Sequence, residues 1–148
     1  MDQFGQMRWA VAVGLGLWLL AIAVIDLKTL RIPDVLSLPL VAMGLLVAGF
    51  SGVSVFAMHL IGAGLGFLVL AGFGEVFFRL RGREGLGLGD AKLFAAAGAW
   101  LGWQALPVVL LVAAVGGLVW AVLRRQNGEV AFGPWLALGF WLVLVSGF

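Results

Sequence analysis

The residues best suited to chemistry in this sequence are carboxylates, and two of them stand at the edges of long apolar segments. Asp90 follows the segment GREGLGLG, in which Gly85, Gly87 and Gly89 alternate, and Asp26 follows the first apolar run of the chain. Alternating glycines leave the backbone bare and conformationally unrestricted, which suits close approach by another chain. An ionisable residue at the edge of a hydrophobic layer is a candidate for function.

Two carboxylates that share one site suit the hydrolysis of a peptide bond without a covalent intermediate. At a low-dielectric boundary the two groups do not both ionise comfortably, so one of them keeps a proton. The ionised group takes a proton from water as general base, while the protonated group polarises the carbonyl and assists the departing amine. Asp26 and Asp90 are therefore the candidate catalytic pair, although interfacial acids occur in any polytopic protein.

The composition leaves few other kinds of site. The chain contains no cysteine, no tyrosine and one histidine, His59. Disulfides, thiolate zinc sites and cysteine nucleophiles are excluded, and a histidine metal site or a serine–histidine triad is not expected. GLGLG differs from the GxGxxG dinucleotide fingerprint and no GK[ST] follows it, so phosphate binding is not indicated. We expect neither a cofactor nor a metal.

The elements that must position these acids are membrane helices. Of the 148 residues, 64% are hydrophobic and 11% are charged, which is more apolar surface than a soluble domain needs. The predicted spans are 9–25, 35–50, 55–78, 91–104, 106–123 and 132–148. We predict an all-α polytopic membrane protein with six transmembrane helices, in a single membrane-embedded domain over residues 1–148.

Short polar or small-residue features punctuate these spans. Residues 26–34 form a polar break, in which Pro33 does not fit deep in a helix and Asp34 is expected to cap the next one. Residues 51–54 are read as an uncharged turn. Gly62 and Gly66, four residues apart, are typical of tight helix packing in membranes. The fourth span has the same spacing at 98 and 102, and His59 is interpreted as a polar helix-packing contact rather than a ligand.

The positive residues predict the topology. All but one of the nine Lys and Arg residues fall in or beside the loops that follow spans one, three and five; the exception is Arg8. The positive-inside rule places these loops, with Asp26 and Asp90, at the cytoplasmic face and both termini on the opposite side of the membrane. These cations are expected to contact lipid, and the net charge of +2 does not indicate nucleic acid. Residues 21–23 (AIA) also fit a signal cleavage site, but loss of a leader breaks the charge pattern.

The remaining acids have structural interpretations beside functional ones. Glu75 is expected to pair with Arg79 at i,i+4, with substrate contact as the alternative. Glu84 is expected to pair with a neighbouring arginine, Arg81 or Arg83, or alternatively to contact a basic substrate. Asp34 is first a helix cap and second a group that faces substrate.

Three segments resemble one known family. The segment 81–103, RGREGLGLGDAKLFAAAGAWLGW, resembles the GxGD segment of type IV prepilin peptidases, which are bacterial membrane aspartic proteases. The stretch DLKTLRIPDVLSLPL, from Asp26 to beyond Pro39, resembles the family's other catalytic stretch, and FGP at 132–134 resembles its C-terminal segment. The matches occur in the family's order and cover most of the chain. By this resemblance Asp26 and Asp90 are the catalytic residues.

The resemblance implies substrates with a short basic leader, a glycine after which cleavage occurs, and an apolar helix that stays in the membrane. The implied partners are prepilin or pseudopilin segments, and the implied location is the bacterial inner membrane. Gly87 and Gly89 are then candidates to admit extended substrate, and Glu84, Asp34 and Glu75 are candidates to attract the basic leader.

One departure limits the resemblance. Many family members carry an additional cytoplasmic domain with paired CxxC cysteines and also N-methylate the new N-terminus. This sequence starts at the first span and has no cysteine, so it resembles the short, core-only members. N-methyltransferase activity is therefore not expected.

Two other classes of function remain open. A small transporter or channel would use the same acids as ion-pathway carboxylates. A non-catalytic assembly factor would hold pilin-like helices in its small-residue grooves. A GxGD protease of the presenilin or signal-peptide-peptidase type fits less well, because Asp26 is expected in a polar turn and the chain is short.

Overall fold

A computed structural model of the chain describes residues 3–29, 32–82, 88–124 and 132–146. These residues form six α-helices and one short 3₁₀ turn, in agreement with the predicted all-α class. The elements are α1 (Gln3–Thr29), α2 (Asp34–Ser51), α3 (Val53–Arg81), α4 (Leu88–Leu101), η1 (Trp103–Ala105), α5 (Leu106–Arg124) and α6 (Gly133–Ser146).

The predicted count of six transmembrane helices is not confirmed. Within the described residues, four stretches are long and apolar enough to cross a membrane: Gly5–Thr29, Asp34–Ser51, Val53–Leu80 and Trp103–Leu123. Helices α4 and α6 have 14 residues each. At about 1.5 Å per residue such a helix rises roughly 21 Å, which is less than the roughly 30 Å of a bilayer's hydrocarbon core.

Several helix ends differ from the hydropathy-based boundaries. Helix α1 continues through the charged residues to Thr29, so Asp26 is helical and does not lie in a polar turn. Helix α4 begins at Leu88, so Gly89 and Asp90 are already part of it. Only Gly52 separates α2 from α3, in place of a four-residue turn. Backbone hydrogen bonding near a membrane favours continuing a helix, and polar side chains alone do not stop it.

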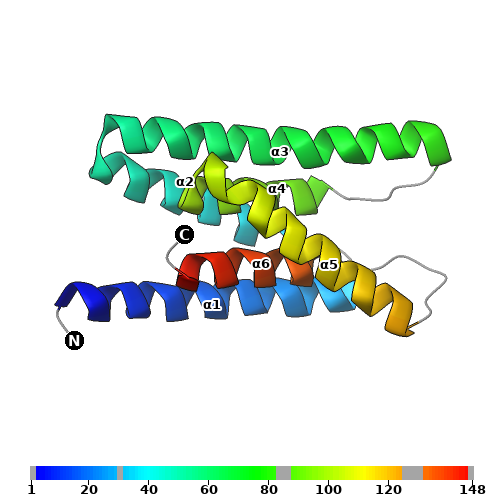
Figure 1. The fold of residues 1–148 in the computed structure, drawn as a ribbon, viewed down its shortest axis with the longest axis horizontal. Coiled ribbons are helices and arrows are strands. Elements are labelled where there is room, and N and C mark those ends of the chain that lie inside the picture. Colours follow the sequence, from blue (N-terminus) through cyan, green and yellow to red (C-terminus); the bar gives the residue numbers. More distant parts are fainter. Residues whose placement is uncertain (1–2, 30–31, 83–87, 125–131, 147–148) are drawn as a thin grey trace.

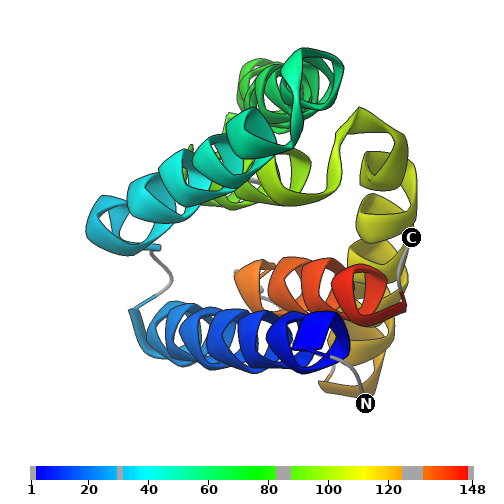
Figure 2. The same ribbon diagram turned by 90° about the vertical axis from the view of Figure 1, so that its left-hand side faces the viewer.

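The helices form two layers (Figures 1 and 2). Helices α1 and α6 lie side by side in one layer, and α2, α3 and α4 pack together in the other. Helix α5 runs from α4 to the α6 side and contacts both. Both termini lie toward the left in Figure 1, whereas the C-terminal ends of α1, α3 and α5 lie toward the right. The chain therefore alternates in direction from one helix to the next.

Helix α4 is the buried centre of the fold. Its residues 93–99 are all buried, and it contacts α2, α3, α5 and α6. Small residues permit this: a Cβ on Gly66 of α3 would lie 2.7 Å from the Phe94 carbonyl oxygen, and one on Gly62 would lie 2.7 Å from that of Gly98. The predicted packing role of the glycines in α3 is thus confirmed. Gly98 and Gly102 both lie against Gly62, as their spacing predicted, and Gly102, at φ 87°, follows the last residue of α4.

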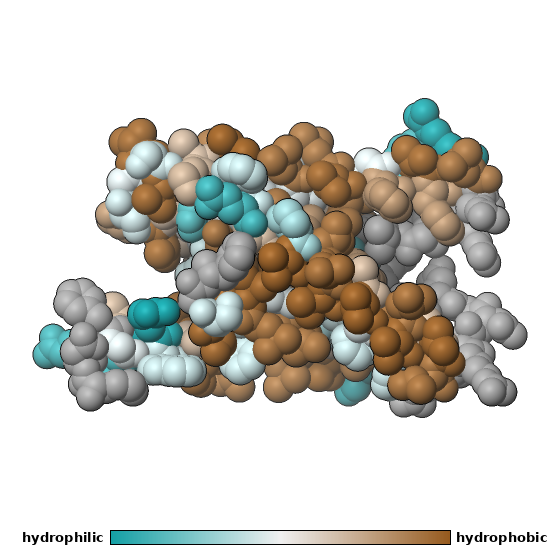
Figure 3. Space-filling model, viewed as in Figure 1, coloured by the Kyte–Doolittle hydropathy of each residue, from teal (hydrophilic) through white to brown (hydrophobic). Residues whose placement is uncertain are grey.

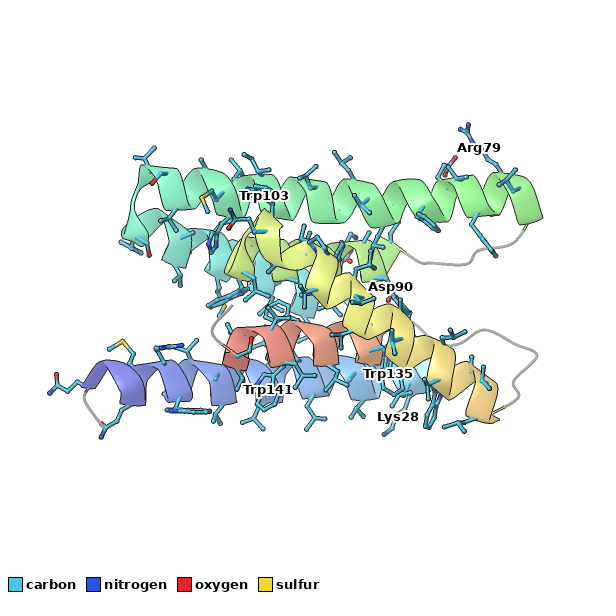
Figure 4. The ribbon with its side chains drawn as sticks, in the orientation of Figure 1. Lys28, Arg79, Asp90, Trp103, Trp135 and Trp141 are labelled. Atoms are coloured by element: carbon cyan, nitrogen blue, oxygen red, sulfur yellow. The ribbon has the colours of Figure 1, made fainter. Side chains whose placement is uncertain are left out.

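Tryptophans connect neighbouring helices through their indole N–H groups. Each donates to a backbone carbonyl: Trp18 to Leu36 (3.0 Å), Trp100 to Leu40 (2.9 Å) and Trp141 to Ala12 (3.0 Å). Trp141 crosses from α6 toward α1 in Figure 4. Glycines make room for two of the rings, since a Cβ on Gly44 or Gly16 would lie 2.8 or 2.7 Å from Trp100 or Trp141. In an apolar surrounding, these bonds satisfy donors that water does not reach.

The outer surface is that of a membrane protein. Large apolar side chains such as Leu17, Leu68 and Leu118 are exposed on three different helices. Figure 3 shows apolar residues over most of one face, with polar residues mainly toward its two ends. An apolar surface of this extent is stable in lipid rather than in water.

Candidate active site

Asp26 lies in the last turn of α1 and is buried, with 5% of its surface exposed. Its Oδ2 accepts a hydrogen bond of 3.0 Å from the backbone N–H of Gly133, the first residue of α6. A carboxylate at the C-terminal end of its own helix meets an unfavourable dipole, whereas the N-terminal end of a helix presents unpaired N–H groups and a favourable one. The N–H groups and the dipole at the start of α6 therefore offset the unfavourable dipole that Asp26 meets at the C-terminal end of α1.

Gly133 is required at this contact by the lack of space. A Cβ on Gly133 would lie 2.5 Å from Asp26 Oδ2 and 3.0 Å from the Cδ1 of Ile32. Real Cβ contacts are essentially never shorter than 3.0 Å, so any other residue would displace the carboxylate or the helix. The glycine of the FGP segment is thus explained by its contact with Asp26.

Asp90 lies in the first turn of α4 and is partly buried. An acidic residue is favoured there by the helix dipole. Figure 4 shows Asp90 at the end of the molecule where α4 begins. The first residues of α6 and the C-terminal ends of α1 and α5 lie toward the same end.

Ile32 connects the surroundings of the two aspartates. This side chain is buried, with 7% exposed, in the short connection between α1 and α2. Its Cδ1 approaches Gly133, which holds Asp26, and a Cβ on Gly89, the neighbour of Asp90, would lie 3.0 Å from its Cβ. The two aspartate-bearing segments and the start of α6 therefore meet at one side chain. We call Asp26, Ile32, Gly89 and Gly133 the aspartate junction.

Asp34 does not cap α2 as predicted. The capping position is Pro33, without a side-chain cap bond, and Asp34 is the first helical residue. Its carboxylate instead pairs with Lys92 of α4 at 2.7 Å, with side chains 56% and 24% exposed. A full charge two residues after Asp90 is a better partner than a backbone N–H, and the pair ties the start of α2 to the start of α4.

Two other predicted residues, Glu75 and His59, lie outside the aspartate junction. Glu75 pairs with Arg79 at 3.1 Å, as predicted, on the exposed end of α3 (Figure 4). His59 contacts the Ala99 carbonyl oxygen at 2.7 Å, which confirms the helix-packing interpretation. Glu84 and Gly87 lie outside the described residues, so their substrate roles stay predictions. Gly89 is helical and packs on Ile32, so it is not part of an open glycine loop.

Sequence reasoning missed Ile32 and gave Gly133 no role. A single apolar residue between Arg31 and Pro33 carries almost no signal, because burial depends on what packs over it. The FGP segment at 132–134 marked Gly133 through its resemblance to the family, without indicating which residue it contacts.

Comparison with known proteins identifies the family. Residues 13–122 match the model of the type IV leader peptidase family. The chain belongs to this family. Curated relatives are named "Prepilin leader peptidase/N-methyltransferase": one from Pectobacterium carotovorum is 47% identical over 91% of this chain, one from Aeromonas salmonicida 44% over 87%, and one from Escherichia coli K12 43% over 82%.

The match covers only part of those relatives. The aligned region is 50%, 46% and 56% of their respective lengths, so this chain spans about half of each. No solved structure is detectably similar to it. Family membership is therefore established by sequence.

Proposed function

We propose that this family member is a membrane aspartic endopeptidase that removes the basic leader of type IV prepilins or pseudopilins, with cleavage after a glycine. The observation that carries the proposal is the aspartate junction, where the segments bearing Asp26 and Asp90 pack on the same Ile32 side chain. The printed names of the relatives support a leader peptidase. Water activated by two carboxylates is a chemistry that these residues are able to perform.

In the proposed mechanism the two carboxyl groups share one proton. The ionised group removes a proton from water as the water attacks the scissile carbonyl, and the other donates a hydrogen bond to the carbonyl oxygen. The protonated group then gives its proton to the departing amine. The carboxylate of Asp26 is held by the N–H of Gly133, and Asp90 lies in the first turn of α4, a helix that contacts α2, α3, α5 and α6.

We place the site at the cytoplasmic face of the bacterial inner membrane, with both termini periplasmic. Support comes from the alternating helix directions, which bring the C-terminal ends of α1, α3 and α5 to one end of the molecule. Those ends border the loops that carry nearly all positive residues. Helices α4 and α6 complete the six-helix bundle from inside, which suits their shorter length.

Leader recognition by acidic residues fits Asp34 best among the described candidates. It is 56% exposed, and its partner Lys92 is two residues from Asp90. A basic leader residue would replace Lys92 on the carboxylate. For Glu75 to bind the leader, a basic leader residue would likewise have to replace Arg79 as its partner. Contacts of substrate with Glu84, Gly87 and Gly89 remain part of the proposal.

The test uses purified full-length protein in proteoliposomes with candidate prepilins, and mass spectrometry of the products. Cleavage after the leader glycine is expected, and Asp26→Asn or Asp90→Asn should abolish it without reducing membrane yield. Normal turnover by the double Asn variant would overturn the proposal. Ion or solute flux without cleavage would favour a transporter, and equal prepilin binding without cleavage an assembly factor. The same spectra report an added methyl group, which we do not expect.

A further inference from the structure

We propose that the backbone amide of Gly133 is a positioning group for catalysis, which fixes the orientation of the Asp26 carboxylate by binding its Oδ2. This inference rests on the proposed function and deepens it. It assigns a role in the reaction to the start of α6, a helix that carries no titratable side chain.

The hydrogen bond is strong in its setting. The Gly133 N–H is one of the first N–H groups of α6, which have no acceptor within their own helix. Both partners are buried, so water does not substitute for either one. A hydrogen bond to a charged group in such surroundings fixes the direction of the acceptor as well as its distance. With Oδ2 held in this way, rotation of the Asp26 carboxylate is restricted.

The donor is itself held in place by contacts that do not involve Asp26. The carbonyl of Phe132 accepts hydrogen bonds of 3.1 Å from the N–H groups of Trp135 and Leu136, which closes the first turn of α6. Further along, Trp141 binds Ala12 of α1. The amide therefore points at a fixed place in the junction.

A purely structural tie between α1 and α6 predicts a different outcome from a positioning role. If the bond only joined two helices, its loss would lower stability and leave the turnover of folded protein unchanged. If it orients Asp26, its loss lowers kcat at unchanged KM, because substrate binding does not depend on the angle of one carboxylate.

The test removes the N–H without adding any atom. Glycolic acid in place of Gly133, introduced by nonsense suppression in the full chain, exchanges the amide for an ester. The matched control is the same exchange at Gly139, inside α6, which also removes one N–H and weakens one carbonyl acceptor. We expect kcat to fall by about ten- to a hundredfold at position 133, with KM unchanged, and to stay near wild type at position 139.

A second pair of variants guards against a fold effect. Alanine at either position adds a Cβ that lies too close to a neighbour. The Cβ would lie 2.5 Å from Asp26 Oδ2 in Gly133→Ala and 2.8 Å from the Val109 carbonyl oxygen in Gly139→Ala. Gly133→Ala should lose more kcat than Gly139→Ala in preparations of equal thermal stability. Wild-type turnover by the position-133 ester, or equal kcat losses in the two Ala variants, overturns the inference. A wild-type protein that cleaves no prepilin in the same assay instead overturns the proposed function.

Discussion

The close packing of α3 on α4 makes a prediction about two glycines that are two residues apart. A Cβ on Gly66 would lie 2.7 Å from the Phe94 carbonyl oxygen, whereas one on Gly64 would have no neighbour within 4 Å. Gly66→Ala and Gly64→Ala add the same atom to the same helix. The change in helix propensity is therefore shared, and the difference between the two variants isolates the contact with α4.

The size of the effect follows from the displacement that α4 must make. Ordinary contact begins at 3.4 Å, so relief of a 2.7 Å approach to backbone requires a shift of about 0.7 Å. Overpacking of this kind costs about 1–3 kcal/mol, and we expect Gly66→Ala to be less stable than Gly64→Ala by that amount. Phe94 is one turn from Asp90. A misplacement of about 1 Å can cost on the order of a hundredfold in rate, so cleavage should fall much more in Gly66→Ala.

The assay is reversible unfolding in mixed micelles, followed by the fluorescence of the seven tryptophans, with prepilin cleavage measured on the same preparations. Gly64→Ala serves as the control for any effect of an added methyl group on expression or micelle binding. Equal stabilities for the two variants would refute the α3–α4 approach. If Gly66→Ala is less stable but turns over substrate normally, the close packing of α3 on α4 is supported, and the claim that α4 fixes the position of Asp90 is refuted.

Three further predictions concern side chains around the site. Ile32→Ala should lower the free energy of unfolding by about 2–4 kcal/mol, because it leaves a cavity at a buried position, and it should also lower kcat. Ile61→Ala, on the exposed surface, is the control and should change neither quantity by a comparable amount. Lys92→Met should lower the free energy of unfolding by at most about 1 kcal/mol, because its ion pair with Asp34 is partly exposed. A double-mutant cycle with Asp34→Asn measures the coupling energy of the pair, and a coupling of zero would show that the pair does not form. Glu75→Gln should shift stability by less than about 0.5 kcal/mol and leave cleavage unchanged, because its ion pair is a solvent-exposed i,i+4 pair; a cleavage defect would instead indicate substrate contact.

Local patterns in the sequence were sufficient to predict the local features of the fold. Apolar runs predicted six helices, the i,i+4 spacing predicted the pair of Glu75 with Arg79, and small residues at 62 and 66 predicted close packing. Helix ends were less predictable, because hydropathy records where side chains become polar and not where backbone hydrogen bonding stops. Asp26 was expected in a turn for this reason, although its helix continues to Thr29.

The junction itself was out of reach because it is made by segments far apart in the chain. Helices adjacent in sequence invite the assumption that α1 packs on α2, yet α1 packs much more extensively on α6. That arrangement brings Gly133 to Asp26 and buries Ile32 between Gly133 and Gly89. No periodicity in either segment encodes the partner, since each residue is small or apolar and fits many surroundings. The resemblance of the FGP segment marked Gly133 without indicating what it touches.

The two aspartates of the proposed catalytic pair lie in different layers of the fold, and this bears on how their positions are fixed. Asp26 belongs to the α1–α6 layer through its bond with Gly133, whereas Asp90 belongs to the α2–α3–α4 layer through the burial of α4. Each aspartate is therefore fixed within its own layer, and their relative position depends on the few contacts that join the layers. Ile32 is one such contact, because it touches Gly133 on one side and Gly89 on the other. The absence of a side chain on Gly89 and Gly133 leaves room for Ile32 at this contact.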